Sequence, residues 1–362
     1  MKKILALIMV LCMVFSLCVF AAADGEEETA PAEEAAEETT EEAAAEEEPA
    51  LLGESEYKLG MGVSLNMNSS KAGNAQVDAT VAAVVLNEEG QIVLAKLDVA
   101  QSKMDVTDGE VDPDKTFLSK VELGDDYNMV KFSEATHEWY EQAAAFEAYV
   151  IGMTADEVAA LETTVNESGH TVTTDEELYA SCSISIDAFQ EAIVKACNDE
   201  QGKTFTAAGL LNLGLAVSTT ADESTAATED EDGVVKMYTN YGAVVVDAEG
   251  VILAAVTDAT QPKITIDVDG EIVETAFNGT KRELKEDYNM VKFSDATLEW
   301  YEQAANFTDY AAGKTAEELQ AAELTLNDEG HMVFVDEELF ASVSISVDGM
   351  IDVLVKAVEY AK

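Results

Sequence analysis

An internal duplication constrains this chain more than any other feature. Asp126–Gly152, DYNMVKFSEATHEWYEQAAAFEAYVIG, aligns with Asp287–Gly313, DYNMVKFSDATLEWYEQAANFTDYAAG, and 20 of these 27 positions are identical by direct count. The two copies are 161 residues apart. A repeat of this length is too long for a solenoid unit and matches the size of a globular domain. The sequence therefore predicts two tandem domains of one fold, at residues 55–199 and 203–362.

The two repeats carry the same predicted elements in the same order. Runs of alternating or continuous apolar residues, separated by glycine-containing turns, predict two strands at the start of each repeat. These strands are expected at residues 77–86, 92–99, 241–246 and 251–257. Helices are expected after the candidate N-caps Ser133, Thr154, Ser294 and Thr315, and again at residues 188–196 and 349–361. Antiparallel hairpins followed by helices predict an α+β fold, in which each domain is an antiparallel sheet with packed helices.

The first of these helices carries a stripe of apolar residues in each repeat. Such a stripe could stack on a planar ligand, but it is more often part of a hydrophobic core. We therefore interpret the stripe as core. Its members are Trp139, Ala143, Phe146 and Val150 in the first repeat, and Trp300, Ala304, Phe307 and Ala311 in the second.

The N-terminal segment has the pattern of a secretory signal peptide. Two lysines at positions 2 and 3 precede a long apolar run, and small residues at Ala21 and Ala23 form a cleavage site. We expect residues 1–23 to be a signal peptide that is removed on export. The alternative is that the apolar run is retained as an N-terminal membrane anchor.

An acidic segment follows at residues 24–54. It contains fourteen acidic residues and no basic residue, mixed with alanine, threonine and proline. Such a composition cannot bury enough apolar surface to offset the entropy of ordering, and its like charges repel. We expect a disordered acidic linker, which could serve as a stalk or as a solubilising tail.

The charge of the chain limits its partners. Among 362 residues, 73 are acidic and 20 are basic, which gives a net charge of −53. Nucleic acid and anionic membrane surfaces would be repelled by this charge, so we expect no nucleic-acid partner.

The cysteines and histidines of the repeats do not form a metal-binding pattern. Cys182 and Cys197 are replaced by Val343 and Val358 in the second repeat, which indicates small buried apolar side chains rather than a disulfide or zinc ligands. His170 and His331 occupy equivalent positions and are interpreted as polar turn residues.

A short acidic and serine-rich phrase closes each repeat just before its last helix. It reads DEELYASCSIS at residues 175–185 and DEELFASVSIS at residues 336–346. Asp175 and Asp336 could cap a helix, with the glutamates favouring its N-terminus. Helix capping does not explain the alternating serines, since a run of hydroxyls leading into a helix is suited to a phosphate group.

This phrase resembles the flavinylation motif of FMN-binding domains. In that motif an aspartate is followed by two variable residues, a serine or threonine, a small residue, an alanine and then a threonine or serine, with another hydroxyl two places later. This chain departs from the motif directly before the alanine, where it has Leu178-Tyr179 and Leu339-Phe340. The matching positions are Asp175, Ala180, Ser181 and Ser183 in the first repeat, and Asp336, Ala341, Ser342 and Ser344 in the second.

The resemblance implies a covalent cofactor and a function. A flavin transferase would attach FMN as a phosphoester to Ser181 and Ser342, giving two FMN groups per chain. Both repeats together are similar to tandem flavinylated surface proteins of extracellular electron transfer. The implied protein is an exported carrier, secreted or held at the cell surface, that relays electrons from a membrane donor to an extracellular acceptor or reductase. Two sites on one chain would form a short relay.

Two other functions remain open at this point. The duplicated pair could be a non-catalytic cell-surface module that binds a wall component or a protein. It could also be a reductase with flavin in one repeat and substrate in the other. The near-identity of the helices around both motifs favours equivalent roles, and hence a carrier rather than a turnover enzyme.

Overall fold

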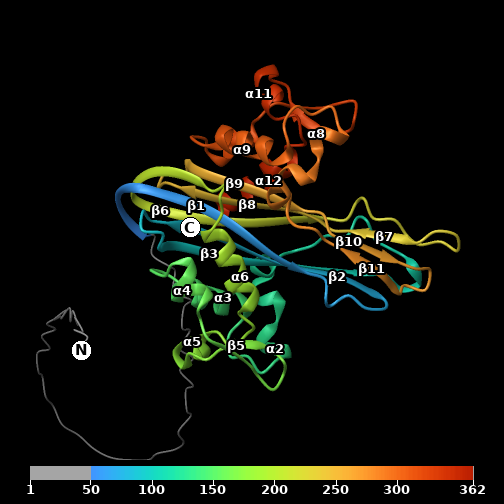
Figure 1. The fold of residues 1–362 in the computed structure, drawn as a ribbon, viewed down its shortest axis with the longest axis horizontal. Helices are drawn as coiled ribbons and strands as arrows, with labels where there is room; N and C mark the ends of the chain where they lie inside the picture. Colours follow the sequence, from blue (N-terminus) through green and yellow to red (C-terminus); the bar gives the residue numbers. More distant parts are fainter. Residues whose placement is uncertain (1–49, 362) are drawn as a thin grey trace, which may run out of the picture. The chain divides into compact units, whose positions relative to one another are not determined.

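The computed structural model describes residues 50–361, which form one compact unit (Figure 1). The fold is mixed α+β with antiparallel sheets, as the sequence predicts. The expected signal peptide, and the expected acidic linker up to residue 49, lie outside the described residues.

A six-stranded antiparallel sheet contains strands from both repeats. Its order is β3-β2-β1-β6-β8-β9, so the two repeats contribute three neighbouring strands each. The strands are β1 (Ala50–Asn66), β2 (Asn74–Leu86), β3 (Ile92–Asp105), β6 (Lys203–Thr220), β8 (Tyr238–Val246) and β9 (Ile252–Thr260). The four predicted strands correspond to β2, β3, β8 and β9.

The central pair, β1 and β6, joins the two repeats. These strands run antiparallel, with Tyr57 opposite Phe205 and their ring centroids 5.9 Å apart. Residues on the two sides of the expected boundary at 199–203 therefore pair directly in one sheet. The strand β1 begins at Ala50, so the last residues of the segment expected to be linker belong to this sheet.

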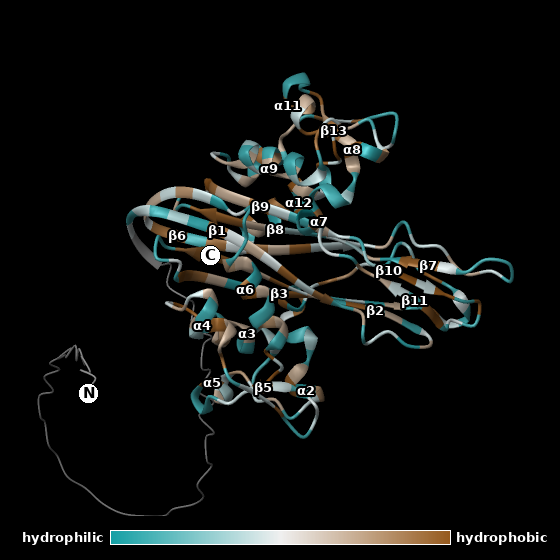
Figure 2. Cartoon of the chain, viewed as in Figure 1, coloured by the Kyte–Doolittle hydropathy of each residue, from teal (hydrophilic) through white to brown (hydrophobic). Residues whose placement is uncertain are grey.

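The two faces of the sheet belong to different cores. Side chains alternate along a strand, so neighbouring residues point to opposite faces. In β2, Val81 and Val85 face a core shared with the strands of the second repeat, whereas Val84 faces the helices of the first repeat. Strands that are not neighbours in the sheet, such as β3 and β6, also approach each other. The sheet therefore curls around a shared inner core, and Figure 2 shows the largely hydrophobic colouring of its strands.

The outer face of each half of the sheet is covered by helices of the same repeat. Helix α6 (Asp187–Cys197) lies against β1 and β2, and helix α12 (Asp348–Tyr360) lies against β6 and β8. Both agree with the predicted closing helices. Glycines allow this close approach, because a Cβ atom at Gly214 would overlap the carbonyl oxygen of Ala357 in α12. The helices of the two repeats lie on opposite sides of the strands in Figure 1.

Shorter elements fill the segment between the strands and the closing helix of each repeat. In the first repeat they are η1 (Thr107–Gly109), α1 (Lys120–Leu123), η2 (Gly124–Tyr127), α2 (Met129–Phe132), α3 (Trp139–Tyr149), α4 (Ala155–Ala159), β4 (Thr163–Val165), β5 (Thr171–Thr173) and α5 (Glu176–Ser181). In the second they are α7 (Lys281–Leu284), η3 (Lys285–Tyr288), α8 (Met290–Phe293), α9 (Trp300–Ala311), α10 (Ala316–Gln320), β12 (Leu324–Leu326), β13 (Met332–Phe334) and α11 (Glu337–Ser342). A separate three-stranded sheet, ordered β11-β10-β7, consists of β7 (Gly233–Lys236), β10 (Lys263–Ile266) and β11 (Ile272–Ala276).

Two of the four predicted helix N-caps are confirmed and two are wrong. Thr154 and Thr315 cap α4 and α10 through capping boxes, as expected. The expectation that Ser133 and Ser294 open the aromatic helices is wrong. These serines end α2 and α8, and the helices start later, after the N-caps Glu138 and Glu299, because each of these glutamates forms a capping box with a second glutamate three residues on.

The apolar stripe on these helices is core, as the sequence predicts. Trp139 and Phe146 are buried and pack around Phe189 of α6, with ring centroids 5.8 Å and 5.6 Å away. In the second repeat, Trp300 and Phe307 are buried in the equivalent cluster.

Charged side chains connect the repeats in a reciprocal pattern. Lys195 of α6 pairs with Glu283 of the second repeat at 3.0 Å, and Lys356 of α12 pairs with Glu122 of the first repeat at 2.5 Å. Lys356 and Glu283 lie 161 residues after Lys195 and Glu122, so each repeat gives the other the same bond. The two repeats therefore pack as pseudo-equivalent halves of one unit.

Candidate functional site

The serine-rich phrase forms a short helix and the turn that follows it in both repeats. Asp175 is the N-cap of α5, and its Oδ1 atom accepts the backbone N–H groups of Glu177 at 3.0 Å and Leu178 at 2.9 Å. The bond from Leu178 is the main reason that the pKa of Asp175 lies below its usual value. Asp336 caps α11 in the same way. The predicted capping role of both aspartates is confirmed.

Ser181 and Ser342 are the last residues of these two short helices. Each is half-buried. The Ser181 hydroxyl donates to the carbonyl of Leu178 at 3.2 Å, and the Ser342 hydroxyl donates to that of Leu339 at 3.0 Å. The preceding alanines, Ala180 and Ala341, are exposed. Both hydroxyl groups thus form hydrogen bonds only within their own helix, at its C-terminal end.

The aromatic residue of the phrase is exposed as well. Tyr179 has 43% of its surface accessible and Phe340 has 40%. An exposed ring therefore stands at the same place in both repeats, two residues before Ser181 and Ser342.

A buried glutamine holds the second serine of the motif in each repeat. The Oε1 atom of Gln142, which is buried in α3, accepts the backbone N–H of Ser183 at 2.9 Å and its hydroxyl at 3.3 Å. Gln303 binds Ser344 at 2.7 Å and 3.2 Å in the second repeat. Sequence reasoning missed both glutamines, although each lies in the identical stretch EWYEQAA.

The glutamines extend this network to the preceding short helix. The Nε2 atom of Gln142 lies 3.2 Å from the sulfur of Met129 in α2 and donates to the carbonyl of His137 at 2.9 Å. The equivalent distance from Gln303 to the Met290 sulfur is 3.4 Å. The motif, α3 and the start of α2 are therefore one connected structure in the first repeat, with an equivalent in the second.

The histidines lie in exposed turns beside the phrase. The Nδ1 atom of His170 is 3.4 Å from the Ser185 hydroxyl, and that of His331 is 3.0 Å from the Ser346 hydroxyl. Both positions agree with the prediction of polar turn residues.

The cysteines are packed in the core of the first repeat, as expected. Both thiols are free and buried. Burial raises the pKa of the Cys182 thiol to about 12 and that of Cys197 to about 11, so neither is a reactive thiolate near neutral pH.

Each repeat also holds a lysine within a cage of aromatic rings. The Lys281 ammonium lies 4.9 Å from the ring centroids of Tyr238 and Tyr288, and 5.1 Å from that of Trp300. Burial lowers the pKa of Lys281 to about 8. Lys120 has the equivalent place in the first repeat, over Tyr127 and Trp139. Cation–π contacts offset the desolvation of these buried cations, so we assign them a structural role.

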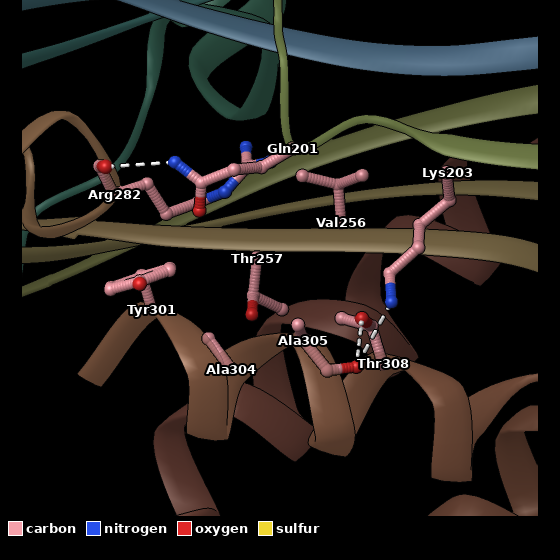
Figure 3. Close-up of a pocket in the computed structure, with 9 residues that line it drawn as sticks. All are labelled: Gln201, Lys203, Val256, Thr257, Arg282, Tyr301, Ala304, Ala305 and Thr308. Atoms are coloured by element: carbon pink, nitrogen blue, oxygen red, sulfur yellow. Dashed lines mark hydrogen bonds between the residues drawn. The ribbon is translucent and has the colours of Figure 1, made fainter. Parts of the chain in front are cut away.

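Two hollows elsewhere in the described part of the chain are not lined by the motif serines. One, of about 10 Å³, lies between the start of β6, β9 and α9, and Figure 3 shows its lining side chains. The Thr257 hydroxyl in this hollow is buried and has no hydrogen-bond partner, and the volume suits a single water molecule. The other, an open hollow of about 640 Å³, lies around the β1–β2 turn.

Comparison with known proteins gives no assignment: no family model, no curated protein and no solved structure matches this chain. Within residues 50–361, no helix has the length and apolarity needed to cross a bilayer. The same residues contain no group of three or more histidine, cysteine or acidic side chains placed to hold a metal ion.

Proposed function

We propose that this protein is an exported electron carrier with FMN esterified to Ser181 and Ser342, one flavin in each repeat. The observation that carries the proposal is the recurrence of the whole motif geometry. In both repeats an aspartate caps the short helix, the acceptor serine ends it, and a buried glutamine holds the next serine. Because both repeats have this geometry, we expect both sites to have the same function.

The local geometry supports the assignment of the acceptor residues. An acceptor hydroxyl has to be reachable by a transferase. Ser181 is half-buried and bonds only to its own helix, whereas both the backbone and the hydroxyl of Ser183 are held by Gln142. A covalent bond also removes the need for an enclosed pocket, since the flavin is retained without tight non-covalent binding.

The chemistry fits export. A protein outside the cell cannot be refilled from cytosolic flavin, and a phosphoester prevents loss by diffusion. The flavin supplies the redox chemistry, while the protein supplies position and electrostatics. The net charge of −53 disfavours a reduced anionic flavin and attracts cationic or metal-bearing acceptors.

The two sites would work separately. Helices α5 and α11 lie on opposite sides of the strands in Figure 1, with both helical layers and the inner core between them. This arrangement favours independent exchange of each flavin with a membrane donor, an acceptor or a reductase, rather than a short relay within the chain.

The test is covalent flavin content after co-expression with a flavin transferase. We expect flavin fluorescence on a denaturing gel, an intact mass with two FMN groups, and loss of both in the Ser181→Ala/Ser342→Ala double variant. The matched control is Ser185→Ala/Ser346→Ala, which removes two nearby hydroxyls and should keep both flavins.

Two outcomes count against the proposal. Fluorescence that persists in the Ser181→Ala/Ser342→Ala protein, with peptide mapping to Ser183 or Ser344, refutes the acceptor assignment. A colourless native protein from a host that has the transferase refutes the flavoprotein itself and supports the non-catalytic binding module.

A further inference from the structure

A short helical segment in each repeat presents apolar side chains to solvent. We call α2 (Met129–Phe132) and α8 (Met290–Phe293) the tongues. Phe132 is 78% exposed and Phe293 is 77% exposed. The valine two residues earlier is 43% exposed in the first tongue and 44% in the second. The same pair of exposed apolar residues recurs in both repeats, which makes the tongues candidates for a binding surface.

The tongues are held in place rather than loosely attached. In the first repeat, the Glu138 carboxylate accepts the backbone N–H groups of Met129 at 2.7 Å and Val130 at 3.2 Å. The Ser133 hydroxyl closes the other end by donating to the Met129 carbonyl at 2.7 Å. Asn128, which precedes the tongue, has a φ of 56°, in the left-handed region.

The second tongue has the same supports. Glu299 accepts the N–H groups of Met290 at 2.8 Å and Val291 at 3.3 Å, and Ser294 donates to Met290 at 2.8 Å. A fixed surface binds with a smaller loss of conformational entropy than a mobile loop.

Each tongue is connected to the serine motif of its own repeat. Met129 contacts Gln142, and Gln142 holds Ser183, two residues after the proposed flavin acceptor. Met290, Gln303 and Ser344 repeat this chain of contacts. The exposed apolar surface and the motif therefore occur together, once per repeat.

We propose that each tongue is the binding surface for the isoalloxazine ring of the flavin carried by the same repeat. This inference rests on the proposed function. A tethered ring is present at a high effective concentration near its attachment point, and Gln142 contacts both the start of the tongue and the second residue after the proposed acceptor, so a small apolar surface there is enough to bind the ring. The phenylalanine offers an aromatic face for stacking, and the valine extends the apolar area.

The charge of the tongue suits this occupant. Lys131 lies over the Phe132 ring at 5.0 Å, and Lys292 lies over the Phe293 ring at 4.7 Å. In a chain with 73 acidic residues, a cation at this surface is complementary to the phosphoester and to a reduced anionic flavin.

The test uses the full-length protein in the Ser342→Ala background, which leaves one flavin in the first repeat. Phe132→Trp places an indole, a contact quencher of flavin fluorescence, at the proposed stacking position. Phe132→Ala removes the aromatic face. Val273→Trp is the matched control, because Val273 is 54% exposed in β11 of the separate three-stranded sheet.

We expect all variants to keep their covalent flavin on a denaturing gel. In the native state, Phe132→Trp should lower the fluorescence per flavin about fivefold, because the indole quenches a stacked ring. Phe132→Ala should lower the ratio of stacked to free flavin ring by about the same factor. The freed ring is then more accessible to iodide, so iodide quenching should increase. Unfolding in urea should abolish the difference between the Phe132→Trp protein and its parent, and Val273→Trp should have no effect.

The outcomes separate the two proposals. Absence of covalent flavin in the parent overturns both. Covalent flavin with unchanged native fluorescence in Phe132→Trp and unchanged iodide quenching in Phe132→Ala overturns the tongue assignment alone. Unchanged quenching together with slower electron exchange with a redox partner in Phe132→Ala also overturns it, and assigns the tongue to a protein partner instead.

Discussion

Arg282 and Asp199 form a buried ion pair between the two repeats. The guanidinium makes two bonds to the carboxylate, at 3.0 Å and 3.1 Å, and each side chain is 8% exposed. Asp199 also accepts the backbone N–H groups of Met61 at 3.1 Å and Gln201 at 2.9 Å. The pair therefore connects α7 of the second repeat to β1 and to the junction between the repeats.

Replacing Arg282 with alanine should lower the free energy of unfolding by about 3 kcal/mol. Removing one partner of a buried pair costs about 3–5 kcal/mol, because the other charge stays buried without compensation. The two backbone bonds to Asp199 remain in the variant, which places the expected loss at the lower end of that range. Arg282 also opposes the burial-raised pKa of Asp258, so its removal should raise that pKa further.

A neighbouring ion pair provides a matched control. Lys285 pairs with Glu200 at 2.9 Å, one residue beyond Asp199, but the two side chains are 41% and 80% exposed. Exposed pairs contribute about 0–1 kcal/mol, so Lys285→Ala should have a small effect. The same stretch of chain thus offers a buried and an exposed bridge between the repeats.

The assay is equilibrium unfolding in urea, with the midpoint and slope fitted for each variant. The double variant Arg282→Ala/Asp199→Ala should lose less stability than the sum of the two single variants, because it leaves no unpaired buried charge. The reasoning is refuted if Arg282→Ala differs from Lys285→Ala by less than about 1 kcal/mol, or if the two single losses add in the double variant.

Three further predictions concern burial. Burial raises the pKa values of Asp98 and Asp258 to about 6, so the folded state binds more protons than the unfolded state between about pH 4 and 6. The free energy of unfolding therefore falls by about 3 kcal/mol per group as the pH rises through this window. The double variant Asp98→Asn/Asp258→Asn should reduce the difference between the urea-unfolding free energies measured at pH 4.5 and pH 7.5. Gly214→Ala should destabilise by about 1–3 kcal/mol in the same assay, because its methyl group would overlap a carbonyl of α12, whereas Gly53→Ala, with open space around it, should not. The Cys182 thiol should resist iodoacetamide at pH 8 until urea unfolds the protein, as followed by intact mass, and fast labelling of native protein would contradict its burial.

The elements predicted best were those with a strong local pattern. The closing helices were expected at residues 188–196 and 349–361, within two residues of α6 and α12, because their apolar spacing and their packing agree. The central strands β1 and β6 were missed. Glycine, serine and threonine dilute their apolar pattern, and at Gly60 and Gly214 the glycines are there to admit a helix backbone, a need that only the packed structure reveals.

In the candidate site, too, local features could be predicted from the sequence and long-range contacts could not. The motif and its capping aspartates could be read from the repeated phrase, because helix capping is a local interaction. Gln142 could not, since a polar residue in an amphipathic helix usually faces solvent. Its bond to Ser183 spans 41 residues, so only the folded chain brings the pair together.

The sharing of one sheet explains why two similar repeats pack as a single unit. An isolated repeat would leave one edge of β1 unpaired and would expose Tyr57, Leu59 and their neighbours on the inner face of its strands. An exposed edge beside an apolar face is an aggregation hazard, and the antiparallel partner β6 covers both the edge and the apolar face.

The reciprocal Lys195–Glu283 and Lys356–Glu122 ion pairs also hold the two halves together. The contact between the repeats thus has the form of an isologous dimer interface contained in one chain, in which each half supplies what the other lacks. Since this contact uses the inner face and the helices use the outer face, the serine motifs and tongues stay at the periphery, as the proposed access of a transferase and redox partners requires.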